Sequence, residues 1–185
     1  VKYLINVMPN CIYPGDLDKY KEEKLWDGDV HNSIKVYGFP RKMMEIACFS
    51  YQKKYNFKAI HLVLPNLYGP GDHFDPIKSH ALGGLISKIA KAKILLLKEV
   101  EIWGSGQPIR EWLYIDDASN AISKFIFKDK YISQNEIINI GTNKGVTIKS
   151  LAYKIKKVQS FFLTEKVKFQ TVKIGEAYQA RSVEK

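Results

Sequence analysis

Short apolar runs of strand length alternate with helical segments along most of the chain, and this alternation constrains the fold more than any other feature. The clearest run, residues 58–64, is rich in Ile, Leu and Val and ends in a loop dense in turn formers. Strands are expected at residues 2–7, 58–64, 99–103, 110–115, 136–140 and 167–170, and helices at 35–55, 79–93, 117–127 and 148–158. Such alternation predicts a mostly parallel sheet in an α/β fold.

Local signals place the ends and faces of these helices. Asp116 or Asp117 is the expected N-cap of the third helix, and Thr147 that of the fourth. The first helix tolerates Pro40 only in its first turn. An apolar face on that helix is supplied by Met43, Met44, Ile46, Ala47 and Phe49.

The 185 residues are 45% hydrophobic, which suits one globular domain or one domain with a small appendage. The longest apolar runs stay far below the roughly 20 residues that span a bilayer, so no membrane partner is expected. The chain opens directly on a strand-like run without an initiator Met or a signal peptide. We therefore expect that a preceding part of the fold is missing.

The cysteine content indicates the cellular compartment, and the charge bears on which classes of partner the protein binds. Two cysteines, Cys11 and Cys48, fit a reducing compartment and predict a cytoplasmic protein. Neither pairs with a histidine at ligand spacing, so no metal site is expected. The net charge is +10, but the lysines are scattered and no nucleic-acid-binding motif occurs, which argues against a nucleic-acid partner. The few arginines are the more informative cations, because a planar guanidinium serves roles that lysine does not.

Tyr37 and Arg41 lie four residues apart, about one helical turn, so both side chains occupy one helix face. A fixed positive charge stabilises a neighbouring phenolate, which is how a tyrosine serves as an acid or base near neutral pH. Lys42 is a poor substitute for Arg41, because one further residue lies about 100° round the helix.

Further motifs follow one another in a fixed order. They are Cys11-Ile12-Tyr13-Pro14, the Tyr37 helix, Asn66-Leu67-Tyr68-Gly69-Pro70-Gly71-Asp72, Ser79-His80, Trp103-Gly104-Ser105-Gly106 with Pro108 and Arg110-Glu111, Ile115-Asp116-Asp117, and Asn139 with Gly141. Together they resemble the extended short-chain dehydrogenases that act on nucleotide sugars, the NAD-dependent epimerase/dehydratase family, and within it the GDP-L-fucose synthases. No G-x-G-x-x-G occurs, so the chain resembles the C-terminal part of that fold.

The resemblance implies a fold and a division of labour. Residues 1–75 would be the end of a Rossmann-like parallel sheet with the catalytic helix, and residues 76–185 mostly a smaller α/β substrate-binding region, with some elements returning to the sheet. The implied activity is that of a nucleotide-sugar epimerase/reductase using NADP or NAD on a GDP-linked sugar, as a homodimer when complete. Two alternatives stay open: another epimerase or dehydratase of the family, and a catalytically impaired protein that binds sugar nucleotides.

The resemblance also implies roles for single residues. Tyr37 would exchange a proton with the sugar oxygen at C4, and Arg41 would stand where the family has a lysine that also holds the nicotinamide ribose. Pro9 occupies the place of a family Ser or Thr hydroxyl, which leaves the neighbouring Asn10 amide as its replacement. Cys11 and His80 would be the acid and base of epimerisation.

The remaining implied contacts are with the ligands. Asn66 and Leu67 would lie beside the nicotinamide, and Trp103 and Arg110 around the GDP, with His80 also near the substrate. Each has a structural alternative: a small buried residue for Cys11, a helix start for His80, a turn for Asn66 and Leu67, and a core position for Trp103.

Overall fold

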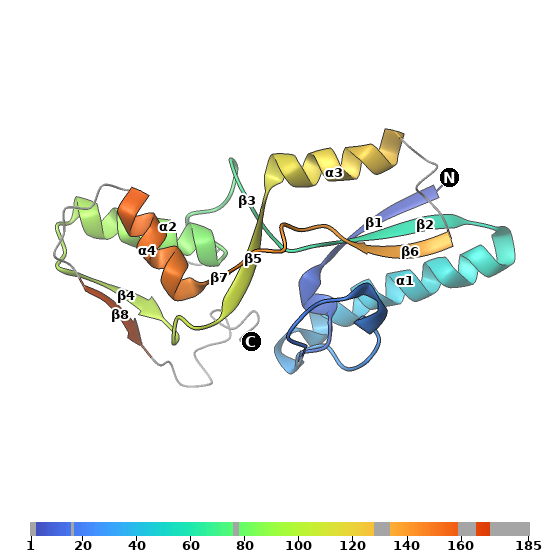
Figure 1. The fold of residues 1–185 in the computed structure, drawn as a ribbon, viewed down its shortest axis with the longest axis horizontal. Coiled ribbons are helices and arrows are strands. Elements are labelled where there is room, and N and C mark those ends of the chain that lie inside the picture. The colour runs from blue at the N-terminus through green and yellow to red at the C-terminus, as the bar shows by residue number, and fades with distance from the viewer. Residues whose placement is uncertain (1–2, 16, 76–77, 128–133, 159–165, 171–185) are drawn as a thin grey trace. The chain divides into compact units, whose positions relative to one another are not determined.

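The structure is a computed structural model that describes residues 3–15, 17–75, 78–127, 134–158 and 166–170 (Figure 1). It contains two compact units. The first comprises residues 1–67 and 111–144, and the second comprises residues 68–110 and 145–184. The two units therefore alternate along the chain, and residues 68–110 of the second unit lie between the two segments of the first.

The first unit is built on a three-stranded parallel sheet of order β1-β2-β6, with β1 at Tyr3–Pro9, β2 at Lys58–Leu64 and β6 at Gln134–Asn139. Figure 1 shows helices α1 (Lys35–Tyr55) and α3 (Ile115–Phe127) on opposite faces of this sheet. The predicted parallel α/β architecture is confirmed, and β2 has the predicted bounds.

The register of the sheet brings two chain segments to the same edge. β1 and β2 pair in parallel from Tyr3 opposite Lys58 to Pro9 opposite Leu64. Beyond this edge β1 continues into the 3-10 helix η1 (Asn10–Ile12), and β2 continues into β3 (Asn66–Tyr68). The carboxyl edge of a parallel sheet is where open α/β folds bind ligands.

A buried aromatic cluster fixes the segment after η1. Tyr13 is 1% exposed, stacks on Tyr20 with ring centroids 4.7 Å apart, and donates a hydrogen bond of 2.8 Å to Asn139 Oδ1. Burial raises the pKa of Tyr13 to about 12, so it stays a neutral donor. Glu22, in η2 (Glu22–Lys24), accepts from the Asn139 amide at 2.9 Å. These bonds hold the long segment after Cys11 against β6.

A second buried polar chain crosses the sheet. Asn6 Nδ2 donates to His61 Nδ1 at 2.9 Å, and His61 Nε2 reaches Asn135 Oδ1 at 2.7 Å. Asn135 Nδ2 then donates to Glu45 Oε1 on α1 at 2.7 Å. Because an amide nitrogen only donates and an amide oxygen only accepts, this chain requires a neutral imidazole with its proton on Nε2. Burial correspondingly lowers the pKa of His61.

Helix α1 turns its polar side inward, contrary to the usual behaviour of a helix on a sheet. The expected apolar face exists but is largely exposed, with Met43 at 61% and Phe49 at 44% exposure. Gly38, Lys42 and Cys48 form the buried side instead. Gly38 allows close approach, because a Cβ there would lie 3.3 Å from Val30 Cγ1.

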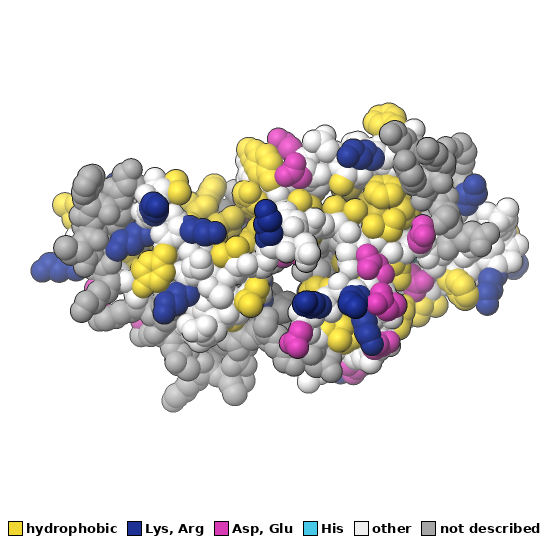
Figure 2. Space-filling view, in the orientation of Figure 1, with side chains coloured by type: hydrophobic (Ala, Val, Ile, Leu, Met, Phe, Trp, Pro, Cys, Tyr) yellow, Lys and Arg dark blue, Asp and Glu magenta, His cyan; other side chains and the backbone are white. Residues whose placement is uncertain are grey.

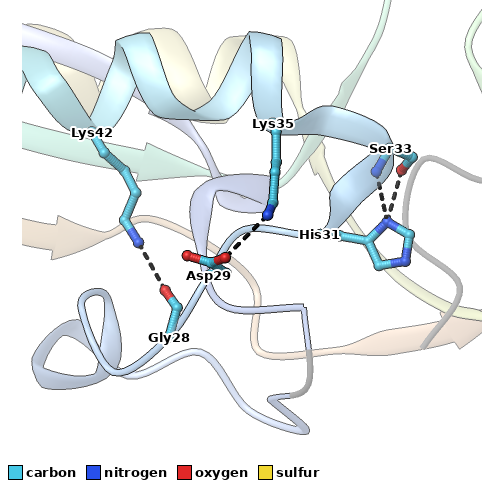
Figure 3. Close-up of polar contacts among 6 residues, drawn as sticks. All are labelled: Gly28, Asp29, His31, Ser33, Lys35 and Lys42. Atoms are coloured by element: carbon cyan, nitrogen blue, oxygen red, sulfur yellow. Dashed lines mark hydrogen bonds and ion pairs between the residues drawn. The ribbon is translucent and has the colours of Figure 1, made fainter.

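The irregular segment before α1 is attached to that buried side (Figure 3). Lys42 is 1% exposed; its Nζ lies 3.4 Å from the Gly28 oxygen and 4.6 Å from the centroid of the Trp26 ring. Burial lowers its pKa. Lys35 Nζ pairs with Asp29 at 3.1 Å. In η3 (Asn32–Ile34), the Ser33 amide donates to His31 Nδ1 at 3.3 Å.

The second unit packs helices α2 (Ala81–Ile94) and α4 (Ile148–Val158) with a parallel strand pair, β4 (Glu99–Trp103) and β8 (Lys166–Gln170). Its buried cluster consists of Leu85, Ile89, Ala92, Val100, Ile102, Ala152 and Ile155. The predicted cap of α4 is confirmed, because the Ser150 amide donates to Thr147 Oγ1 at 3.1 Å.

Three short strands and one helix start complete the comparison with the sequence. Strands β3, β5 (Ile109–Tyr114) and β7 (Gly145–Thr147) form a sheet of order β3-β5-β7. The predicted cap of α3 is wrong: the helix begins at Ile115, so Asp116 and Asp117 lie in its first turn. In this first turn their negative charges interact favourably with the positive end of the helix dipole and stabilise the helix.

Helix α2 ends in a Schellman motif with an unusual residue at its centre. The Leu97 amide donates to Ala92 O at 2.9 Å and the Leu96 amide to Lys93 O at 3.1 Å. Leu96 takes the left-handed conformation, with φ of 50°. Glycine usually fills this position, and a side chain there costs about 1–2 kcal/mol.

Candidate active site

Tyr37 and Arg41 meet on one face of the first turns of α1, as predicted. The Arg41 guanidinium carbon lies 3.6 Å from the centroid of the Tyr37 ring, and Arg41 Nη1 donates to the Tyr37 carbonyl at 3.1 Å. Tyr37 is 47% exposed, so solvent and ligands have access to it. The guanidinium thus stacks on the ring, an arrangement that its planar form permits and a lysine ammonium lacks.

Cys11 lies in η1, which packs against α1, and its thiol is half-buried. Burial raises its pKa, while a hydrogen bond with its own backbone and the charge of Arg41 act in the opposite direction. Arg41 is therefore close enough to influence both Tyr37 and Cys11. A thiol within electrostatic range of a guanidinium that itself stacks on a tyrosine gives this part of the chain groups capable of acid–base chemistry.

The chain changes direction at the positions expected to contact the sugar oxygen. Pro9 is extended, with φ of −80° and ψ of 149°, and Asn10 begins the 3-10 helix. The strict alternation of side chains in a strand therefore ends at Pro9. This turn is the local twist that a contribution from Asn10 requires, and the role of Asn10 stays a prediction.

Asn66 begins β3, just beyond the end of β2, and is held by the backbone of β5: its Nδ2 donates a hydrogen bond of 3.1 Å to the backbone carbonyl oxygen of Glu111. The Glu111 carboxylate in turn accepts from the amides of Thr142 and Asn143. Gly141 leaves room for it, because a Cβ there would lie 2.5 Å from Glu111 Oε1. Asn66 and the half-buried Leu67 are thereby fixed near the same edge as η1.

His80 stands at the N-cap position of α2 in the second unit and is exposed. Its side chain makes no capping hydrogen bond, although its carbonyl accepts from the Gly84 amide at 2.9 Å. The imidazole therefore does not serve the helix start through its ring. Cys11 and His80 belong to different units, and their pairing stays a prediction.

The second unit also carries the residues predicted to contact the nucleotide. Trp103 ends β4 and is 49% exposed, which is more than a core position would give. Arg110 in β5 is 8% exposed, and its Nη1 donates to the Ile109 oxygen at 3.4 Å. Their ligand contacts remain predictions.

The sequence analysis assigned no functional or buried position to two lysines, Lys88 and Lys42, that the structure shows in contact with tryptophan rings. Lys88 on α2 places its Nζ 4.0 Å from the centroid of the Trp103 ring, and burial lowers its pKa. Its spacing of eight residues from His80, about two turns on one helix, was the available signal. Lys42 gave no signal, because its partners Trp26 and Gly28 lie in an irregular segment.

Across the residues that the structure describes, no group of three or more His, Cys, Asp or Glu side chains is arranged to hold a metal ion. None of the described helices is long and apolar enough to cross a membrane.

Comparisons with known proteins cover most of the chain. The NAD dependent epimerase/dehydratase family matches residues 1–141. The chain is 35% identical over 162 residues to probable GDP-L-fucose synthase 1 of Oryza sativa subsp. japonica, covering 87% of this chain and 48% of the relative. It is 36% identical over 166 residues to the GDP-L-fucose synthase of Sinorhizobium fredii, covering 87% and 51%.

Solved structures give the same picture. The GDP-mannoheptose C4 reductase from Campylobacter jejuni with NADP bound has a TM-score of 0.79 and 30% identity, covering 92% of this chain and 60% of that one. The NADP-bound GDP-L-fucose synthetase from Naegleria fowleri has a TM-score of 0.77 and 27% identity, covering 92% and 53%. The chain spans about half the length of the curated relatives it matches. Its matched residues and Rossmann-like parallel sheet place it in the NAD dependent epimerase/dehydratase family.

Proposed function

We propose that this chain is part of a nucleotide-sugar epimerase/reductase resembling the GDP-L-fucose synthases. The observation that carries the proposal is the stacking of Arg41 on Tyr37 in α1, the helix against which η1 packs with its Cys11 at the carboxyl end of β1. Relatives that share this part of the fold are named as GDP-sugar synthases and reductases.

In the reductive half of the reaction, Tyr37 donates a proton to the sugar oxygen at C4. The bound NADP, or NAD, would supply the hydride. The Arg41 guanidinium stabilises the phenolate that remains and turns toward the nicotinamide ribose, while Asn10 donates to the sugar oxygen in place of the hydroxyl that Pro9 lacks.

The residues present fit one end of the cofactor. Asn66 and Leu67 lie beyond the end of β2, where a nicotinamide would lie in a fold of this type. No G-x-G-x-x-G occurs in the 185 residues to receive the diphosphate at a helix start. The chain thus supplies the nicotinamide end of the site and not the diphosphate cradle.

In the epimerising half, Cys11 and His80 remove and return protons at carbons that the neighbouring ketone activates. The half-buried thiol and the exposed imidazole, which does not cap its helix, support this role. Neither group contacts the oxygen at C4 in this scheme, so epimerisation and reduction depend on different side chains.

The second unit binds the nucleotide part of a GDP-linked sugar. Trp103 offers an exposed aromatic face, and Lys88, whose Nζ lies on that ring, supplies a cation for the diphosphate together with Arg110. The first unit, with α1, then carries the cofactor chemistry. The expected division near residue 75, with some later elements returning to the sheet, stays a prediction, and the grouping of residues 111–144 with residues 1–67 supports it.

Assembly and location complete the proposal. The complete protein forms a homodimer, which the exposed apolar face of α1 supports: Met43 is 61% exposed, Tyr51 58% and Tyr55 60%. Free thiols at Cys11 and Cys48 support a cytoplasmic location.

The decisive experiment uses the whole protein that contains this chain, a GDP-4-keto sugar and NADPH. Tyr37→Phe should lower the reduction rate by roughly 10²–10⁴-fold, because it removes the proton donor. Tyr55→Phe, on the same helix, should leave the rate unchanged. Cys11→Ser or His80→Gln should stop entry of solvent deuterium at C3 and C5, read by NMR, while reduction of an already epimerised sugar continues.

A second candidate is a protein that binds sugar nucleotides without turnover. The stacking of Arg41 on Tyr37 and the absence of a hydroxyl at Pro9 favour it. Retained affinity for a GDP-sugar with no reduction and no deuterium exchange in the unmodified protein would establish this alternative and exclude the enzyme.

A further inference from the structure

The end of α2 and the turn that leads to β4, which Figure 1 shows as a ribbon, contain four consecutive aliphatic residues whose side chains are exposed. These residues, 94–97, are here called the α2 tip. Ile94 is 79% exposed and Leu96 80%, while Leu95 is 54% and Leu97 46% exposed. Single exposed aliphatic residues are ordinary, but four in a row form a contiguous patch of the kind that marks an interaction site.

The backbone shows that this patch is maintained against a local cost. Leu96 occupies the left-handed centre of the Schellman motif, where glycine or asparagine would be relaxed. Its side chain gains little burial in return, since four-fifths of it is exposed. A strained backbone that displays an apolar group points to a use outside the fold.

The charged residues next to the patch are mostly basic. Residues 91–98 contain Lys91, Lys93 and Lys98 and no acidic residue, and the first carboxylate beyond them is Glu99 at the start of β4. Figure 2 shows mainly dark blue side chains, with little magenta, over the unit that holds α2 and α4. The partner of the α2 tip should therefore combine an apolar interior with an anionic surface.

We propose that the α2 tip docks on an anionic lipid surface, with the aliphatic side chains in the boundary between headgroups and acyl chains and the lysines on the headgroups. Such insertion needs only a few apolar side chains supported by cations. A stable protein interface needs about 800 Å² on each partner, far more than four side chains supply. A second copy of the chain is disfavoured because its lysines would face those of the first.

This surface contact differs from the membrane partner that the sequence argues against. A spanning segment needs about 20 apolar residues, and none of the described helices offers them, whereas docking at the interface buries only the α2 tip. The proposal does not depend on the catalytic assignment, since no residue of the tip belongs to the site.

The test is co-sedimentation of the chain with vesicles of phosphatidylcholine alone and of equal phosphatidylcholine and phosphatidylglycerol. The chain should sediment with the mixed vesicles at low salt, dissociate from them at high salt, and not bind the vesicles of phosphatidylcholine alone. Leu96→Gly should weaken binding by roughly tenfold. Lys91→Gln and Lys98→Gln should each weaken it by roughly fivefold. Val158→Ser, which alters another 82% exposed aliphatic residue of the same unit, should have no effect.

Leu96→Gly also separates docking from folding. Glycine relieves the left-handed position, so thermal stability should stay equal or rise while vesicle binding falls. Failure of the unmodified chain to bind the mixed vesicles, or binding by Leu96→Gly equal to that of the unmodified chain, would overturn the proposal. A change in molar mass on Leu96→Gly without vesicles would overturn it in favour of a contact between copies.

Discussion

Two neighbouring glycines in the first turn of α2 offer a matched pair of substitutions with opposite expected results. A Cβ on Gly83 would lie 2.4 Å from the carbonyl oxygen of His73, which is backbone. A Cβ on Gly84 would lie 3.1 Å from Ser79 Oγ, the end of a side chain that can rotate away. We expect Gly83→Ala to destabilise the protein and Gly84→Ala to be tolerated.

The magnitude follows from two opposing contributions. Both substitutions gain about 1 kcal/mol, because alanine favours a helix over glycine by that amount. Because the Ser79 side chain can rotate away, Gly84→Ala should keep this gain and raise the free energy of unfolding by about 1 kcal/mol. At Gly83 the backbone must move, and such overpacking costs about 1–3 kcal/mol. Because the helix gain cancels between the variants, Gly84→Ala should be the more stable by about 1–3 kcal/mol.

Urea unfolding followed by circular dichroism measures this difference directly from the two midpoints. Gly83→Ala should also have a functional consequence. The added Cβ pushes against the His73 backbone, and the resulting shift disturbs the start of α2, where His80 lies. The entry of solvent deuterium at C3 and C5 of the sugar should then be slower in Gly83→Ala and unchanged in Gly84→Ala. Equal stability of the two variants, or a more stable Gly83→Ala, would refute the argument from close approach.

Two further predictions concern titration. Burial holds the pKa of His61 below its ordinary 6.5, so the stability from its neutral form is present above about pH 6.5 and is lost as the pH falls through the lower folded pKa. The urea midpoint of the unmodified protein should therefore fall as the pH is lowered, and that of His61→Gln should fall less. An equal fall in both proteins would show that His61 is not the titrating group. The charge of Arg41 lowers the pKa of Cys11 and so opposes the effect of burial. Arg41→Met, in a Cys48→Ser background, should therefore shift the pH dependence of Cys11 alkylation by iodoacetamide to higher pH. An unchanged pH dependence would show that Arg41 does not influence the Cys11 thiol.

The sequence was sufficient where a segment carries its own signal. The run at β2 and the strand β4 have the predicted bounds, because apolar residues and flanking turn formers are local features. Strands β3 and β7 were missed, since three residues make a strand only through partners far away in the chain. The cap of α3 was misplaced by two or three residues for a related reason: Asp116 and Asp117 favour a helix start without fixing it.

The candidate site shows the same limit. Spacing alone places Tyr37 and Arg41 on one helix face, and it cannot show that the guanidinium lies on the ring. Likewise an apolar pattern on α1 does not reveal which side is buried. Lys42 is buried because Trp26 and Gly28 receive it, and those residues lie in a segment without periodicity.

The alternation of the two units along the chain has a consequence during synthesis. The strands β2 and β6 pair side by side, yet about 70 residues separate Leu64 from Gln134 along the chain. At a synthesis rate of roughly 5–20 residues per second, the ribosome releases β6 about 4–14 seconds after β2. In this interval the hydrogen-bonding edge of β2 that β6 will occupy is open, next to apolar side chains such as Ile60 and Leu62. The growing chain thus has an unpaired strand edge, a target for chaperones and for misassociation, which pairing with β6 later covers.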